Sequence, residues 1–120
     1  MDDEKYAASF DIIMKAGDAK SNAMMAVEEA KNRNFEEARR LLDEARQEMI
    51  DSHVSQTELI QAEANGNPVE MNIILVHAQD HFSMATTAID FAEHFIDLYE
   101  EMSQIEETVN QYKTMVKIVV

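Results

Sequence analysis

The chain has 120 residues and a formal net charge of −14, from 24 acidic and 10 basic side chains. Nucleic acids and anionic lipids are bound through Lys and Arg, so this balance excludes nucleic acid as a partner and argues against direct attachment to a membrane. The chain has no cysteine, which excludes disulfides, thiolate metal sites and cysteine nucleophiles.

The scarcity of turn-forming residues predicts an all-α fold in a single domain. Only two glycines and one proline occur, whereas Ala, Glu, Met and Leu, which favour helices, are frequent. No apolar run reaches the 18 residues of a membrane span, and the acidic start MDDEK differs from the basic start of a signal peptide. We therefore expect a cytoplasmic protein.

The first two helices are predicted at about 3–31 and 35–64. The segment KNRNFEE (31–37) separates them, with Asn34 as the expected N-cap and Glu37 completing a capping box. In each helix, residues spaced three or four apart form a stripe that we expect to face the core. The first stripe comprises Tyr6, Phe10, Ile13, Gly17, Met24 and Val27, and the second comprises Ala38, Leu42, Ala45, Met49, Ser52, His53, Gln56 and Ile60.

The third helix is predicted at about 69–103, after the break ANGNPVE (64–70). Gly66 suits the left-handed end of a helix, and Pro68 follows it. The expected stripe is Ile73, Val76, His77, Asp80, His81, Met84, Ala88, Phe91, Phe95, Leu98 and Met102. Short connections favour an antiparallel up-down-up three-helix bundle. Wide stripes leave apolar surface uncovered, which predicts self-association into a closed ring.

A C-terminal extension follows the predicted bundle. We expect residues 1–103 to form the three-helix domain and residues 104–120 to form an extension that is helical or poorly ordered. Its apolar residues continue a stripe of alternating four- and three-residue steps through Ile105, Val109, Tyr112, Val116 and Val119.

Polar groups interrupt the stripes of the second and third helices at one level. Pairing the two helices about their connection places His53 opposite Asp80 and Gln56 opposite His77, within the stretch IILVHAQDHFSMATT (73–87). The first helix contributes the apolar Phe10 and Ile13 at this level. Three interpretations are open: a polar layer that fixes the register of the helices, a metal site, or a histidine that accepts a phosphoryl group.

The metal interpretation is narrowed by the residues around the histidines. His77 and His81 lie four apart on one helical face, as in HExxH metalloproteases, but Ala78 stands where the catalytic Glu is required. No histidine has a Glu three residues before it, which excludes a ferritin-like di-iron site. A structural metal at Asp80 remains open.

The nucleophile interpretation requires an accessible imidazole with donors around it. His77 is the candidate acceptor, with His81, His53 and Gln56 as supporting groups. No Lys or Arg occurs between Arg46 and Lys113. A phosphoryl group held without fixed positive charge suits a relay that must pass it on.

Three blocks of sequence carry a resemblance to a known family. The segments AGDAKS (16–21), SHVSQTELI (52–60) and VHAQDHFSM (76–84), one on each predicted helix, resemble the EIIA component of the lactose/cellobiose/chitobiose class of the sugar phosphotransferase system. The resemblance covers about residues 7–99. It does not extend to the C-terminal extension.

The resemblance implies a fold, an activity and a set of partners. It implies a homotrimer of three-helix subunits in which His77 accepts a phosphoryl group from HPr and passes it to a cysteine of EIIB, while sugar enters through EIIC. Contact with the membrane would then be indirect. The resemblance places His81 beside the acceptor, packs His53 and Gln56 against it, and places Asp80 at the trimer axis, where three copies hold a divalent cation, expected to be Mg²⁺. The rival hypothesis is a non-catalytic, metal-stabilised helical interaction module.

Overall fold

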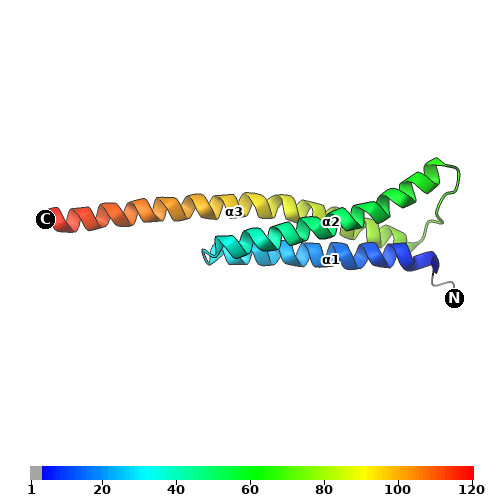
Figure 1. Ribbon diagram of the computed structural model, residues 1–120, viewed down its shortest axis with the longest axis horizontal. Coiled ribbons are helices and arrows are strands. Elements are labelled where there is room, and N and C mark those ends of the chain that lie inside the picture. Colours follow the sequence, from blue (N-terminus) through cyan, green and yellow to red (C-terminus); the bar gives the residue numbers. More distant parts are fainter. Residues whose placement is uncertain (1–3) are drawn as a thin grey trace.

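The computed structural model describes residues 4–120, with side chains from Tyr6 onward, and it consists of three long helices. These are α1 (Glu4–Lys31), α2 (Phe35–Ala64) and α3 (Ile73–Val119). Figure 1 shows α1 and α3 running in one direction and α2 running back in the opposite direction, within a rod of 78 × 26 × 20 Å. Helix α1 packs against both of the other helices. The prediction of an all-α fold with three long helices is confirmed. The expected first residue of α1, Asp3, and the acidic N-terminus lie outside the described residues.

The turn between α1 and α2 is closed by backbone hydrogen bonds. Arg33 has a φ of 68°, its N–H donates to the carbonyl of Ala30 at 3.0 Å, and the next N–H, of Asn34, donates to Glu29 at 2.8 Å. This left-handed ending normally uses glycine. Asn34 is the N-cap of α2, but its side chain bonds to Glu29 and makes no cap hydrogen bond, so the predicted capping box with Glu37 is wrong.

The connection between α2 and α3 is longer than predicted. Gly66 adopts a φ of 84°, as expected for its place after α2. Residues 69–72, directly after Pro68, are not helical, and α3 begins at Ile73 instead of near residue 69. Asn72 sets this start, because its side chain accepts a hydrogen bond of 2.9 Å from the N–H of Leu75 in the first turn.

The core consists mainly of alanine. These small side chains let the helices approach closely along most of their shared length. The buried apolar residues are Ile12, Ala16, Ala19, Ala23, Ala26, Ala30, Ala38, Leu41, Leu42, Ala45, Leu75, Ala78, Ala85, Ile89, Ala92 and Ile96.

The predicted core faces of α1 and α3 are therefore partly wrong. Phe10, Met24, Phe91, Phe95 and Leu98, which the stripes placed inside, are 47–59% exposed. The alanine face of each helix lies beside the face of large residues, and both repeat with helical spacing. Because alanine side chains fill the space between the helices, the large apolar side chains lie on the outside of the bundle.

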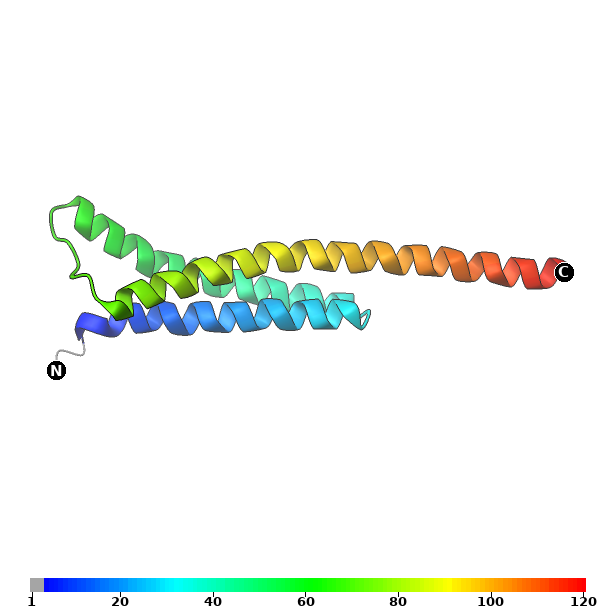
Figure 2. The same ribbon diagram turned by 180° about the vertical axis from the view of Figure 1, so that it is seen from behind.

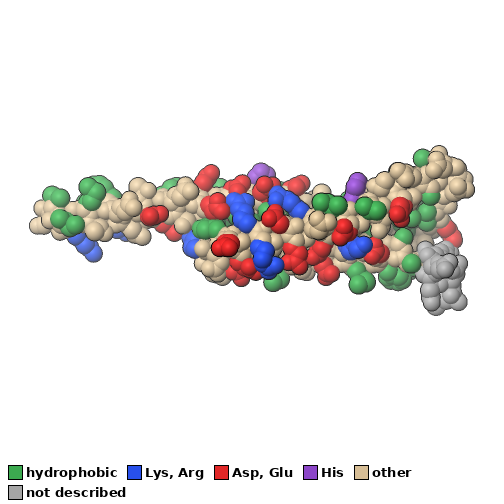
Figure 3. Space-filling view, viewed as in Figure 1, with side chains coloured by type: hydrophobic (Ala, Val, Ile, Leu, Met, Phe, Trp, Pro, Cys, Tyr) green, Lys and Arg blue, Asp and Glu red, His purple; other side chains and the backbone are tan. Residues whose placement is uncertain are grey.

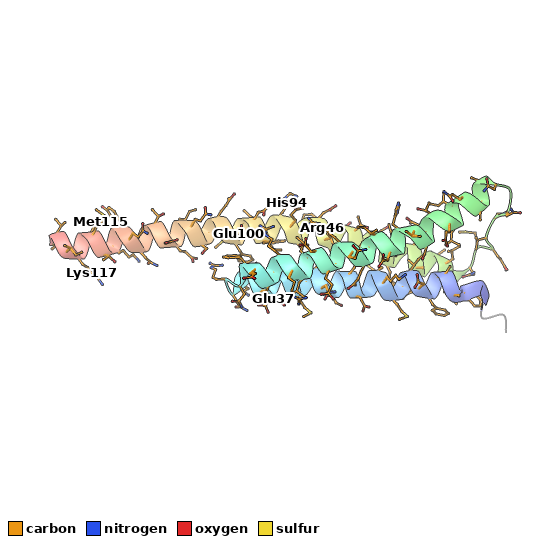
Figure 4. All side chains as sticks on the ribbon, in the orientation of Figure 1. Glu37, Arg46, His94, Glu100, Met115 and Lys117 are labelled. Atoms are coloured by element: carbon orange, nitrogen blue, oxygen red, sulfur yellow. The ribbon has the colours of Figure 1, made fainter. Side chains whose placement is uncertain are left out.

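Arginines of α2 bind α2 to α3 over only part of their length. Arg39 pairs with Asp97 at 2.7 Å and with Glu100 at 3.1 Å, and Arg46 pairs with Glu93 at 2.7 Å. Figure 4 shows Arg46 and Glu100 on these facing helices. Toward its C-terminal end α2 diverges from both other helices, as Figures 1 and 2 show from opposite sides. The stretch that carries the histidines lies on the diverging side.

One carboxylate between α1 and α2 opposes folding at neutral pH. Glu48 accepts a hydrogen bond of 2.7 Å from Asn22, but its other oxygen is buried without a partner. Burial, together with the negative charges of Asp18 and Glu44, raises the pKa of Glu48 above its ordinary value of 4.5. A raised pKa means that the charged form destabilises the fold, and this effect disappears as the pH falls below the ordinary value.

A Glu48→Gln variant is therefore expected to unfold at a higher temperature than the unaltered protein at pH 7. The difference should shrink as the pH falls through the raised pKa, because the native carboxyl then becomes neutral itself. Thermal melts followed by circular dichroism at several pH values measure this. Glu58→Gln, on the exposed side of the same helix, is the control and should change little; a gain for Glu48→Gln that persists at low pH would contradict the account.

Helix α3 continues far beyond the other two helices. Residues 104–119, predicted to be helical or poorly ordered, form the last part of this 47-residue helix, and their side chains are exposed. Because α3 runs through the predicted boundary at residue 103 without interruption, the division into two segments remains a prediction. None of the described helices is both long and apolar enough to cross a membrane.

Candidate functional site

Two histidines of α3 form a hydrogen-bonded pair. The Nε2 atoms of His77 and His81 lie 3.0 Å apart, and the rings meet edge to face with centroids separated by 4.4 Å. His77 is exposed and His81 is half-buried. In this hydrogen bond one Nε2 carries the hydrogen and the other offers its lone pair, so the tautomer of one ring determines that of its neighbour.

The side chains of α2 meet α3 two residues away from the predicted register. Gln56 donates to Gln79 at 2.6 Å instead of facing His77, and the ring of His53 lies 6.1 Å from that of Phe82 instead of facing Asp80. The later start of α3, at Ile73, moves the centre of the connection toward higher residue numbers and accounts for the direction of the shift. Within residues 4–120, no hydrogen bond joins His53 or Gln56 to the histidine pair, so their supporting roles remain predictions.

The predicted polar layer also includes the first helix. Asp11 accepts hydrogen bonds from Ser55 of α2 and from Lys15, both at 2.9 Å. The expectation that α1 contributes only apolar groups at this level is therefore wrong. The hydrogen bond from Lys15 is the largest effect that lowers the pKa of Asp11, and the bond from Ser55 adds to it, so this link between the helices keeps its charge.

An apolar pocket and a cation flank the histidine pair. A pocket of about 350 Å³ opens between α3 and the diverging end of α2; its lining includes Leu59, Ile60 and Val76. Farther along α3, Lys20 of α1 shares a shallow hollow with Met84 and its neighbours. Sequence reasoning missed this cation because it considered only Lys and Arg residues near the histidines along the chain.

Asp80 lies beside the pair on the same turn of α3. It is exposed, and within the described part of the chain its carboxylate makes no hydrogen bond or ion pair. No group of three potential metal-ligating side chains occurs among these residues. The described part of one chain thus brings no three such ligands together at Asp80.

Comparison with models of protein families shows to which family the chain belongs. The family model described as "PTS system, Lactose/Cellobiose specific IIA subunit" matches residues 7–100. The chain belongs to this family. The lichenan-specific phosphotransferase enzyme IIA component of Bacillus subtilis is 43% identical over 104 residues, covering 87% of this chain and 94% of that protein. The lactose-specific EIIA component of Staphylococcus epidermidis is 35% identical over 101 residues, 84% of this chain and 97% of that protein.

Solved structures of IIA subunits share the fold. The cellobiose-specific enzyme IIA of Bacillus anthracis superposes with a TM-score of 0.82 at 38% identity, covering 83% of this chain and 92% of that one. The IIA subunit of a complex between chitobiose IIA and HPr from Escherichia coli superposes with a TM-score of 0.72 at 28% identity, covering 82% of this chain and 96% of that one.

This family member is thus a phosphotransferase-system EIIA component for sugars of the lactose/cellobiose class. The resemblance carried by the three sequence blocks is confirmed at the level of the family, the phosphotransferase activity and the role in sugar transport. The family match ends at residue 100, so α3 beyond that point has no counterpart in it.

Proposed function

We propose that the protein is a phosphohistidine carrier: His77 accepts a phosphoryl group from phospho-HPr and passes it to a cysteine of EIIB during uptake of a lactose- or cellobiose-type sugar. The observation that carries this proposal is the exposed His77 ring bonded through Nε2 to His81 at 3.0 Å. The relationship to a IIA subunit studied in complex with HPr supports the choice of donor. A relay fed by phosphoenolpyruvate implies the cytoplasm as its compartment.

The transfer is a displacement between two protein nucleophiles. The lone pair of a His77 ring nitrogen attacks phosphorus, the bond from phosphorus to HPr breaks, and its electron pair stays on HPr. The thiolate of EIIB then attacks phosphorus, and the electron pair of the breaking P–N bond returns to His77. Positioning is the main contribution of the protein to such steps.

His81 supports this chemistry by holding and releasing a proton donor. When its Nε2–H points to His77, the His77 ring is held with Nε2 unprotonated, and this hydrogen bond breaks before the Nε2 lone pair attacks phosphorus. Once that nitrogen binds phosphorus, the same N–H can turn to a phosphoryl oxygen. A hydrogen bond to a charged oxygen is stronger than one between neutral groups, so His81 favours the loaded state.

The surroundings of His77 suit transient docking. The apolar pocket beside Val76 and the exposed Met84 offer surface to HPr and to EIIB in turn. The chain carries a net charge of −14, and Figure 3 shows Asp and Glu concentrated over the three-helix part. A partner with a basic face would be attracted over a distance.

We further propose that three copies assemble around an axis that passes near Asp80 and that a divalent cation, expected to be Mg²⁺, binds there. An exposed carboxylate without a partner fits such a shared site, because oxygen ligands suit Mg²⁺ and the described part of one chain brings no three potential ligands together. The exposed Phe91, Phe95 and Leu98 supply apolar surface for the contact. The cation would neutralise three converging carboxylates.

An Asp80→Leu variant is expected to remain a trimer in EDTA, because three leucines can pack where three carboxylates repel each other. The unaltered protein should lose subunits or unfold at a lower temperature under the same conditions. Analytical ultracentrifugation with and without Mg²⁺ measures this. Asp90→Asn, also exposed on α3, serves as the control; dissociation of Asp80→Leu into monomers would show that the cation does more than neutralise charge.

Labelling separates the carrier from the rival hypothesis, a non-catalytic, metal-stabilised interaction module. The protein is incubated with enzyme I, HPr and radiolabelled phosphoenolpyruvate, and the product is mapped by mass spectrometry. A carrier gains a phosphoryl group that is labile in acid and stable in base, located on the peptide that contains His77, and loses it when EIIB is added. An unlabelled protein would support the interaction module instead.

A further inference from the structure

The face of α3 that packs inside the bundle loses its apolar character where the other helices end. Between Leu75 and Tyr99 this face is mostly apolar, and its three- and four-residue spacing then passes through Ser103. The next positions on the same face are polar: Glu106, Asn110, Lys113 and Lys117. The extension thus has no apolar side that continues the intramolecular core.

A second face of α3 does continue, and it is apolar throughout. Two sets of residues recur every seven positions, which is the repeat of a coiled coil. We name this face the outer seam; it consists of Met84, Ala88, Phe91, Phe95, Leu98, Met102, Ile105, Val109, Tyr112, Val116 and Val119. In the single chain its large members are 38–84% exposed.

Among the described residues, the extension makes no hydrogen bond or ion pair with another helix or turn beyond its root. Arg33, at the turn between α1 and α2, donates to Glu106 at 2.7 Å and lies 5.5 Å above the ring of Tyr99. These contacts join the root of the extension to the turn between α1 and α2. The exposed helix beyond them is rich in β-branched residues, and a helix of about 15 residues without packing is only marginally stable in water.

Copies of the same helix are the occupants that best fit the outer seam. In a parallel assembly one contact buries the seam both beside the bundle and along the extension, whereas antiparallel extensions could bury only the terminal half. β-branched residues stand at both kinds of core position, Val109 and Val116 at one and Ile105 and Val119 at the other, and this favours three strands over two.

The charges beside the outer seam are compatible with the parallel arrangement. In a parallel coiled coil Glu101 of one copy comes close to Glu106 of the next. Arg33 already pairs with Glu106, which offsets that repulsion. Lys117 is not a member of the outer seam, and Figure 4 shows it on the side of the extension opposite Met115.

We propose that residues 104–119 of three copies form a parallel three-stranded coiled coil that extends the subunit contact beyond the family's bundle. This inference rests on the trimer proposed above. It assigns to the extension a contact between copies of this chain, continuous with that of Phe91, Phe95 and Leu98.

The chain contains no cysteine, so single cysteines can report this contact. Val119→Cys lies in the outer seam, and Thr114→Cys lies on the opposite side of the extension as a matched control. Each full-length variant is oxidised with copper phenanthroline and run on a non-reducing gel. We expect efficient disulfide-linked dimers for Val119→Cys, about tenfold more than for Thr114→Cys. In a three-stranded coil no more than two of every three chains can be linked, whereas a two-stranded coil allows nearly complete linkage.

Two further cysteine variants distinguish contact between the extensions from contact between the bundles. Phe95→Cys probes the outer seam beside the bundle. Linkage at Phe95→Cys without linkage at Val119→Cys would overturn the coiled coil and leave the trimer standing, and no linkage at either position would overturn both. If Val119→Cys links only when mixed with Met102→Cys, the extensions pair antiparallel and the proposal is wrong. Phosphorylation of the same variants reports separately on the carrier function.

Discussion

A His77→Gln variant will take up no phosphoryl group from phospho-HPr. Glutamine keeps the approximate size and hydrogen-bonding capacity of histidine, but its amide nitrogen has no free lone pair with which to attack phosphorus. The measurement is incorporation of label from phosphoenolpyruvate through enzyme I and HPr. His94→Gln, which alters another exposed histidine of α3, should be labelled like the unaltered protein.

The neighbouring histidine makes this test specific. Because the Nε2 atoms of His77 and His81 lie 3.0 Å apart, a His77→Gln variant that still carries label would indicate that His81 is an acceptor. His81→Leu removes the supporting donor and should slow loading of His77 by about 10- to 100-fold, the effect of one hydrogen bond to a charged group. His81→Gln restores an N–H donor and should recover part of that rate.

An Ile96→Ala variant will lose about 2–5 kcal/mol of unfolding free energy. Ile96 is completely buried and is among the largest side chains in a core composed mainly of alanine. Alanines around it cannot extend into the space left behind, and repacking would require whole helices to move. Urea unfolding at low protein concentration measures the loss.

The control for this prediction is the same chemical change at the surface. Ile50 of α2 is 58% exposed, so Ile50→Ala should alter the unfolding free energy by about 0.5 kcal/mol or less. Equal losses at the two positions would contradict the assignment of the core to the alanine faces.

Sequence reasoning was most successful where local chemistry decides the outcome. Helix-breaking and capping residues predict where α1 and α2 end and that Gly66 is left-handed. The contact between His77 and His81 follows from their spacing of four residues on one helical face. The start of α3 had a readable signal in Asn72, but the nearby Pro68 suggested an earlier start. Helical periodicity and capping explain these results.

It was less successful where two faces of one helix compete. In α1 and α3 both the alanine face and the face of large residues repeat with helical spacing, and only the packing of the three helices decides which turns inward. The positions of Lys20 beside Met84 and of Asp11 beside Ser55 also depend on that packing. The left-handed Arg33 could not be anticipated because such a site normally uses glycine.

The length of α3 places its C-terminal end far from the histidine pair. His77 and Val119 lie on one continuous helix, 42 residues apart and therefore about 63 Å distant at 1.5 Å per residue. A fluorophore or surface linker attached near Val119 would therefore remain remote from His77, the proposed docking site. In the proposed coiled coil the same helix would hold it at a nearly fixed distance, so energy transfer to a labelled HPr on an immobilised molecule would test the proposed docking at His77.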